Sequence, residues 1–177
     1  IRDRRIGVPI CEDIWFGDVC AHLKAEGADL LVSPNGSPFE RGKHEKRCAH
    51  ARARVGETGL PLVYVNQFGG QDELVYDGAS FALNADGKLA AHLPSFSETT
   101  SVIGVDEDFG VPLLTGQMTP PDDGMGALYR GLTLGLRDYI DKNGFPGVVL
   151  GLSGGIDSAI VAALAVVSSQ FCDSCEQ

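Results

Sequence analysis

The sequence predicts an α/β fold that holds parts of two domains. Short apolar runs typical of buried strands alternate with segments of helical spacing, an acidic stretch rich in Pro and Gly then breaks the pattern, and the alternation resumes after it. The chain has 177 residues, which is enough for one ordinary domain or for parts of two.

The first half of the chain alternates strands and helices. Apolar runs at residues 5–10, 29–33 and 62–66 are expected to form buried strands. Helical spacing predicts helices over residues 17–26 and 43–58, and the Lys, Arg, Glu and Ala content of the second is typical of a solvent-facing helix. This β-α-β-α-β order implies a parallel or mixed sheet covered by helices.

The middle of the chain changes character. Short strands separated by turn signals are expected at residues 79–83, 89–93 and 101–105. Residues 106–126 are acidic, rich in Pro and Gly, and without periodicity, which predicts a linker.

A second α/β domain begins after this stretch. Helical spacing returns at residues 127–142, residues 148–150 are a short apolar run expected to form a strand, and residues 159–167 are apolar enough for a buried helix.

A glycine-rich octet, Gly-Leu-Ser-Gly-Gly-Ile-Asp-Ser at residues 151–158, lies between this strand and helix. Amides at a helix N-terminus have no intrahelical partners and carry partial positive charge, so they favour an anion. Gly154 and Gly155 allow close approach, and Asp157 is suited to hold a divalent metal against phosphates. The alternative is a tight turn whose Ser or Asp caps the helix.

The octet lacks the Lys of a Walker A loop and the spacing of a dinucleotide fingerprint. It resembles the pyrophosphate loop of the N-type ATP pyrophosphatases, which adenylate an oxygen of their substrate and release the pyrophosphate that the loop holds. The resemblance implies Mg²⁺ at Asp157. It also implies that ATP is bound by Gly151, Leu152, Ser153, Gly154, Gly155, Ile156, Asp157 and Ser158.

Cys11 directly follows the first expected strand. A nucleophile at a strand end, followed by a turn, exposes its sulfur above the sheet, where nearby amides can stabilise an oxyanion. The alternative is a small, buried, unreactive cysteine.

The residues around Cys11 favour the first interpretation. Ile-Cys-Glu-Asp-Ile-Trp-Phe at 10–16, Val-Ser-Pro-Asn-Gly-Ser-Pro at 32–38 and Asp-Gly-Ala-Ser at 77–80 together resemble the nitrilase (carbon–nitrogen hydrolase) superfamily, in the branch fused to NAD synthetase. In that family a Glu–Lys–Cys triad hydrolyses an amide through a thioester. The resemblance makes Cys11 the nucleophile and places the triad Glu and Lys before residue 1.

The resemblance also implies a glutamine site. By position, Ser37 and Lys43 match its residues, and a hydroxyl and a cation suit a zwitterionic amino acid. Lys43 is equally suited to be a solvated charge at the start of its helix. Glu12 is expected to contribute its backbone amide to the oxyanion hole.

The two resemblances in this order are those of the glutamine-dependent NAD synthetase family. They imply the C-terminal part of a nitrilase-like α-β-β-α sandwich (1–106), a linker (107–126) and the first part of a Rossmann-like ATP pyrophosphatase domain (127–177). The implied reaction converts deamido-NAD, ATP, glutamine and water into NAD⁺, AMP, pyrophosphate and glutamate.

Other interpretations remain open. One is a different carbon–nitrogen hydrolase or ATP-pyrophosphatase amidotransferase, such as a GMP synthetase, although the glutaminase of that enzyme uses a Cys–His pair of another fold. Another is a non-catalytic, nucleotide-binding remnant. The start without Met and the abruptly polar residues 168–177 suggest an internal segment, which we expect to be inactive alone and part of a homo-oligomer when complete.

Composition argues against several partners. The net charge of −10 and pI of about 4.7 disfavour nucleic acid. No apolar run reaches the roughly 18–20 residues of a membrane helix. Five cysteines fit reduced thiols of a cytoplasmic protein. Cys172 and Cys175 form a Cys-x-x-Cys pair without a second ligand pair, which makes metal or redox chemistry there a weak interpretation.

The four histidines lie outside these motifs. We expect them to face solvent or to cap helices: His22, His44, His50 and His92.

Overall fold

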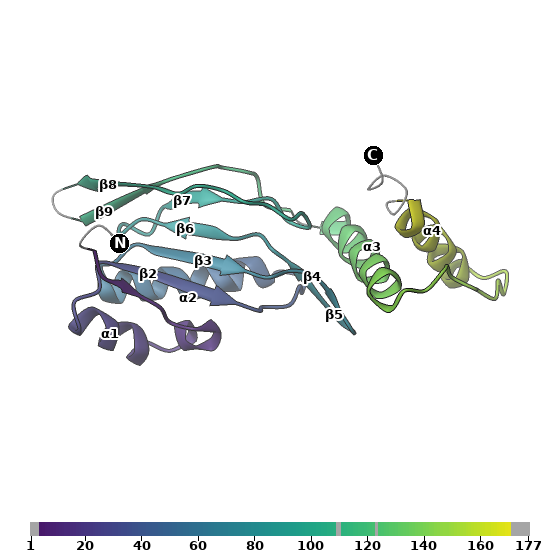
Figure 1. Ribbon diagram of the computed structural model, residues 1–177, viewed down its shortest axis with the longest axis horizontal. Helices are drawn as coiled ribbons and strands as arrows, with labels where there is room; N and C mark the ends of the chain where they lie inside the picture. Colours follow the sequence, from purple (N-terminus) through teal and green to yellow (C-terminus); the bar gives the residue numbers. More distant parts are fainter. Residues whose placement is uncertain (1–3, 109–110, 123, 171–177) are drawn as a thin grey trace.

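The computed structural model describes residues 4–108, 111–122 and 124–170, so the tail and the Cys172–Cys175 pair lie outside the described residues. Figure 1 shows a sheet that carries the first two helices and, beyond its end, a pair of helices. The strands are β1 (Ile6–Gly7), β2 (Leu30–Asn35), β3 (Leu62–Asn66), β4 (Phe68–Gln71), β5 (Leu74–Asp77), β6 (Phe81–Leu83), β7 (Leu89–His92), β8 (Gly104–Asp108) and β9 (Val111–Thr115). The helices are η1, a short 3-10 helix (Cys11–Trp15), α1 (Asp18–Ala25), α2 (Lys43–Thr58), α3 (Gly124–Asn143) and α4 (Ile156–Gln170).

The main sheet is mixed, as the β-α-β-α-β order predicts. Its strand order is β1-β2-β3-β6-β7, with β1, β2 and β3 parallel and the last two pairings antiparallel. Parallel strands present their carboxyl ends at one edge, and the segments after β1, β2 and β3 therefore meet there.

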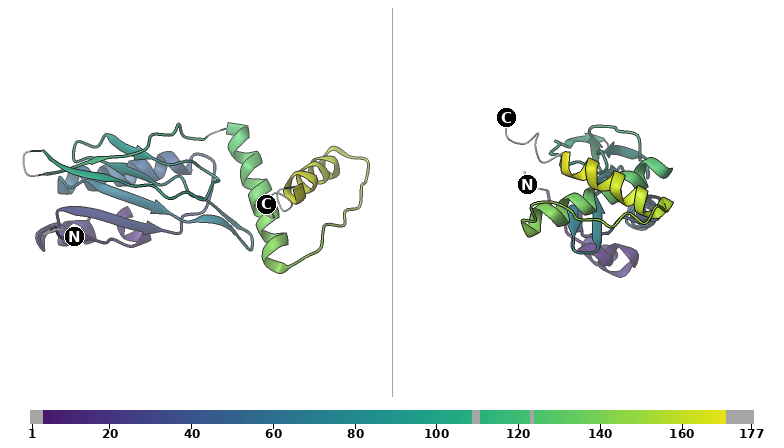
Figure 2. Two further views of the ribbon diagram at one scale, coloured as in Figure 1. Left: turned by 45° about the horizontal axis from the view of Figure 1, so that its top comes forward. Right: turned by 90° about the vertical axis from the view of Figure 1, so that its right-hand side faces the viewer.

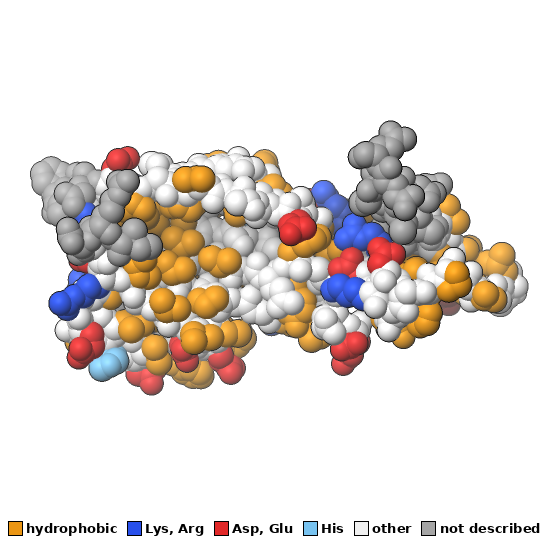
Figure 3. All heavy atoms as spheres, viewed as in Figure 1, with side chains coloured by type: hydrophobic (Ala, Val, Ile, Leu, Met, Phe, Trp, Pro, Cys, Tyr) orange, Lys and Arg blue, Asp and Glu red, His pale blue; other side chains and the backbone are white. Residues whose placement is uncertain are grey.

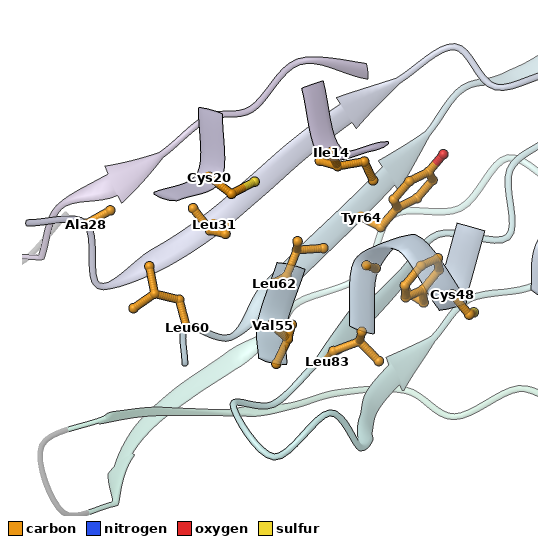
Figure 4. Packing of buried hydrophobic residues seen from close by; sticks show 12 residues of the cluster. Ile14, Cys20, Ala28, Leu31, Cys48, Val55, Leu60, Leu62, Tyr64 and Leu83 are labelled. Atoms are coloured by element: carbon orange, nitrogen blue, oxygen red, sulfur yellow. The ribbon is translucent and has the colours of Figure 1, made fainter. Parts of the chain in front are cut away.

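The core lies between this sheet and helices α1 and α2 (Figure 4). Alternate strand residues such as Leu31, Leu62 and Tyr64 point into it, as the period of two in a strand requires. The expectation that residues 43–58 form a solvent-facing helix is wrong for one side of α2. That side is buried against the sheet and includes Arg47, Cys48, Ala51, Arg54, Val55 and Thr58.

The opposite face of the sheet is packed by β9. Leu114 is buried against Leu30, Ala82 and Ala91. The prediction that residues 106–126 lack periodicity is therefore wrong for residues 111–115, which alternate exposed and buried and pair with β8. Figure 3 shows further apolar side chains on this side of the molecule.

Several other strand predictions need correction. The strand expected at 5–10 is only Ile6–Gly7, because Pro9 cannot donate to a ladder. The β4–β5 hairpin was not predicted. Residues 148–150 form no strand, because a strand needs a hydrogen-bonded neighbour and none of the described residues supplies one.

The two last helices form a pair beside the hairpin (Figure 2). The carboxylate of Asp138 in α3 accepts a hydrogen bond from the Gly70 amide of β4 at 2.7 Å, and Gly135 lets α3 approach Val75 closely. Helix α4 forms as predicted but is not buried: Ile160 and Val161 are exposed, and Leu164 is buried on the side toward α3.

Candidate functional site

Cys11 stands at the start of η1, four residues after β1 ends. Its φ of +51° lies in the left-handed region, which costs a non-glycine residue about 1–3 kcal/mol and is typical of functional turns. The turn is closed by hydrogen bonds from the Ile10 amide to the Asp13 carboxylate (2.7 Å) and from the Asp13 amide to the Ile10 carbonyl (3.0 Å). Cys11 is half-buried, whereas Cys20 and Cys48 are buried in the core.

Tyr64, in the middle of β3, lies beside this turn and next to Ile14 (Figure 4). Burial raises the pKa of its hydroxyl, Arg47 and a hydrogen bond with Ser37 oppose the rise, and the charge of Cys11 adds to it. Tyr64 and Arg47 line one cavity, and Arg47 bonds the Ser37 hydroxyl, so these three side chains lie together.

Ser37 is held in place by the buried guanidinium of Arg47. The Arg47 side chain donates to Ser37 Oγ (3.0 Å), to the Ser37 carbonyl (2.7 Å) and to the Pro38 carbonyl (3.0 Å). Its remaining nitrogen bonds both carboxylate oxygens of Asp77 at 2.9 and 3.0 Å. Asn66 accepts from the Ser37 amide, which fixes the loop from a third side.

Lys43 opens α2 and faces the turn that carries Cys11. Its ammonium lies 3.1 Å from Glu40 and 5.7 Å from the centre of the Trp15 ring, within the range of a cation–π interaction. Trp15 in turn stacks on His50. A cavity of about 140 Å³ lies here, lined by Ile14, Trp15, Lys43, Lys46, Arg47, His50 and Tyr64.

The structure thus brings Cys11, Ser37 and Lys43 to one edge of the sheet. Glu12 follows Cys11 in η1 with an exposed side chain, which leaves its predicted role to its backbone amide. Tyr64, Arg47 and Asp77 were not predicted. The signal that could have found Asp77 is its position at the head of the Asp-Gly-Ala-Ser motif.

The expectation for the histidines is wrong for two of them. His92 is buried, and its Nε2 lies 3.2 Å from His44 Nε2 while its Nδ1 donates to the Thr119 carbonyl at 2.7 Å. Burial lowers the pKa of His44 to about 4, and it also lowers the pKa of His92. Both rings therefore stay neutral near pH 7 and join α2 to the segment before α3.

The glycine-rich octet lies apart from this cluster, in the connection between α3 and α4. Residues 151–155 form an exposed turn and the helix begins at Ile156, so the octet is not part of a continuous helix. Gly154 has a φ of +84°, and the hydroxyls of Ser153 and Ser158 lie 3.1 Å apart at the helix start. The turn therefore presents hydroxyls and first-turn amides to solvent.

Comparison with known proteins defines the class. Residues 1–110 match the family model of carbon–nitrogen hydrolases, and residues 128–170 match that of NAD synthase. The chain belongs to the carbon–nitrogen hydrolase family, with a nitrilase-like domain followed by the start of an NAD synthase domain.

Individual relatives define a smaller group of proteins than the family model does. The chain is 50% identical over 163 residues to a glutamine-dependent NAD(+) synthetase of Rhodobacter capsulatus, covering 90% of this chain and 29% of that protein. It is 43% identical to the synthetase of Xanthomonas campestris, covering 94% and 30%. It spans about 30% of the length of these curated relatives.

Solved structures agree with this assignment. The glutamine-dependent NAD+ synthetase of Acinetobacter baumannii in complex with ADP has a TM-score of 0.83 and 40% identity, covering 92% of this chain and 31% of that one. The synthetase of Cytophaga hutchinsonii has a TM-score of 0.69 and 27% identity, covering 95% and 26%. Among the described residues, no helix is both long and apolar enough to cross a membrane.

We expect Asp77→Asn to lower the free energy of unfolding by about 3–5 kcal/mol, because the buried Arg47 cation loses its partner. The matched control is Asp86→Asn, whose exposed pair with Lys88 is screened by solvent and should contribute little. Urea denaturation of both variants measures the difference. Equal, small losses would show that the buried pair does not stabilise the loop.

Stability should fall as the pH drops from about 6.5 to about 4. In this range His44 is protonated in the unfolded chain but stays neutral in the folded chain, where its pKa is about 4. The contribution of neutral His44 to the free energy of unfolding is therefore fully present above about pH 6.5 and is lost as the pH falls toward 4. His44→Gln should flatten the pH profile, whereas His22→Gln, at an exposed site, should not. Denaturation midpoints across this range give the profile, and a wild-type slope in His44→Gln would contradict the assignment.

Proposed function

We propose that this chain belongs to a glutamine-hydrolysing NAD⁺ synthase, which converts deamido-NAD, ATP, glutamine and water into NAD⁺, AMP, pyrophosphate and glutamate. Residues 1–106 are part of its glutaminase domain, residues 107–126 connect the domains, and residues 127–177 begin the ATP-using domain. The proposal rests on the similarity to glutamine-dependent NAD(+) synthetases and on the site at the edge of the sheet.

The observation that carries the glutaminase role is the half-buried thiol of Cys11 at a positive-φ turn, whose Trp15 lies beneath the ammonium of Lys43. Ser37 is bonded to Arg47, which lines the same cavity as Trp15 and Lys43. The Cys11 sulfur attacks the side-chain amide carbon of glutamine; the C–N bond breaks, ammonia leaves, and a thioester forms. Water then attacks the thioester carbon, which returns the thiol and releases glutamate. The Glu12 amide donates to the developing oxyanion, and Ser37 and Lys43 hold the amino-acid end of glutamine.

The glycine-rich turn fits a nucleotide. Its positive-φ Gly154 and the paired hydroxyls of Ser153 and Ser158 lie at the start of a long helix, which is the donor set that a phosphate requires. We assign ATP binding to residues 151–158 and Mg²⁺ binding to Asp157. The metal, when bound, offsets the charge of the pyrophosphate. The residues of the turn hold and orient that group.

Three further assignments follow from the same proposal: a homo-oligomer, a cytoplasmic location and small-molecule substrates rather than nucleic acid. The net charge of −10 supports the last of these. The NAD synthase match favours this ligase over a GMP synthetase.

In the protein translated from the complete gene, Cys11→Ala should lower glutamine-dependent NAD⁺ synthesis by at least about a thousandfold, because no nucleophile remains. Synthesis from added ammonium chloride should persist, since the ATP-using domain is intact. Cys20→Ala, in the core, should retain both activities. Loss of the ammonia-dependent rate in Cys11→Ala, or survival of the glutamine-dependent rate, would overturn the proposal.

Gly154→Val should instead abolish both activities and weaken ATP binding by about tenfold or more. A β-branched side chain at a φ of +84° strains the turn and blocks close approach of a phosphate. Calorimetric titration with ATP and Mg²⁺ measures the affinity. Gly147→Val, in the open connection before the octet, serves as the control, and unchanged affinity in Gly154→Val would refute the assignment.

A further inference from the structure

Arg54 is a second buried arginine of α2, and it has no role in the reaction proposed for Cys11. It is 7% exposed and lies seven residues after Arg47, two helical turns along the same buried side. Burying a guanidinium is costly unless its donors find partners. The Nε of Arg54 has no hydrogen-bond partner among the described residues, so the partners of its two Nη groups indicate what the residue holds.

Those partners lie on the turn that carries Cys11. Arg54 Nη1 donates to the carbonyl of Ile14, within η1, at 3.3 Å. Arg54 Nη2 pairs with the Glu57 carboxylate at 2.5 Å. Glu57 packs closely against Gly17, because a Cβ added to Gly17 would lie 2.8 Å from Glu57 Oε2. Arg54 thus bonds η1 near its end, and Glu57 packs against the chain just beyond it.

The turn needs such an anchor. A positive φ at a non-glycine residue persists only where the surrounding structure over-determines it. The bonds between Ile10 and Asp13 close the turn from within, and the buried Ile14 fixes η1 to the core. Arg54 adds a bond from a different element, the same helix whose Arg47 holds the Ser37 loop.

We propose that Arg54 is a positioning residue for Cys11, keeping the thiol in its strained conformation by anchoring η1 at the Ile14 carbonyl, with Glu57 packed against Gly17. The proposal rests on the proposed role of Cys11 as nucleophile. In this arrangement α2 fixes both loops of the site, one through Arg47 and one through Arg54. The hydrogen bonds of Arg54 to described residues go to Ile14 and Glu57 and not to the thiol of Cys11.

The first test is backbone hydrogen exchange of the 177-residue chain, followed by mass spectrometry. In Arg54→Met, amides of residues 11–17 should exchange about tenfold faster or more, because a charged donor to η1 is lost, while residues 62–66 of β3 stay within about twofold. Arg54→Lys should recover part of the protection. Arg52→Met, on the exposed side of α2, should match wild type.

The second test is kinetic and uses the protein from the complete gene. Arg54→Met should lower kcat with glutamine by about tenfold or more, leave KM for glutamine within about threefold, and leave the ammonia-dependent rate unchanged. Arg54→Lys should restore part of kcat. A merely structural role would change both rates together.

Unchanged exchange of residues 11–17 in Arg54→Met would overturn the proposal, as would equal loosening of residues 62–66. An unchanged kcat would do the same. These failures are distinct from failure of the proposed function, which shows in Cys11→Ala.

Discussion

The buried ion pair between Arg47 and Asp77 is the constraint on which the arrangement of the site depends. The two side chains are 3% and 7% exposed, so their charges can be buried only because each finds several partners. The guanidinium satisfies the carbonyls of Ser37 and Pro38 as well as the carboxylate. The loop after β2 can therefore take the conformation in which the Ser37 hydroxyl lies beside Tyr64.

The same pair ties the site to the hairpin and to α3. Asp77 ends β5, and β5 also accepts the Phe39 amide at the Val75 carbonyl, 2.6 Å away. The Phe39 ring fits against Gly131 of α3, where a Cβ would lie 3.2 Å from it. Phe39 therefore links the loop that holds Ser37 to α3, which makes α3 a structural neighbour of the candidate site.

Local sequence patterns predicted much of the sheet and the positions of the motifs. The bounds of β3 and α2 were predicted correctly, because each element keeps the residue spacing of its own secondary structure from end to end. Strand β9 was not predicted because it contains Pro112, and the β4–β5 hairpin was not predicted because β4 contains Gly69 and Gly70. Both residue types are typical of turns. Residues 148–150 are apolar enough for a strand, yet pairing depends on a neighbour that lies outside a local pattern.

The motif residues of the site were predicted, but the residues that hold them were not. Arg47 and Arg54 look like solvated charges within a basic helix, and their burial depends on Asp77, 30 residues away, and on the Ile14 carbonyl, 40 residues away. The same reason explains His44 and His92, which meet across 48 residues. Polar partners that are far apart in the sequence produce no periodic pattern, so their contacts cannot be predicted from local spacing.

The most direct test is a crystal structure of the protein after reaction with a diazoketone analogue of glutamine. The account predicts a covalent bond to Cys11 Sγ, with the amino-acid end of the adduct near Ser37 and Lys43. An adduct on another residue, or one whose amino-acid end points away from the loop that Arg47 holds, would contradict it.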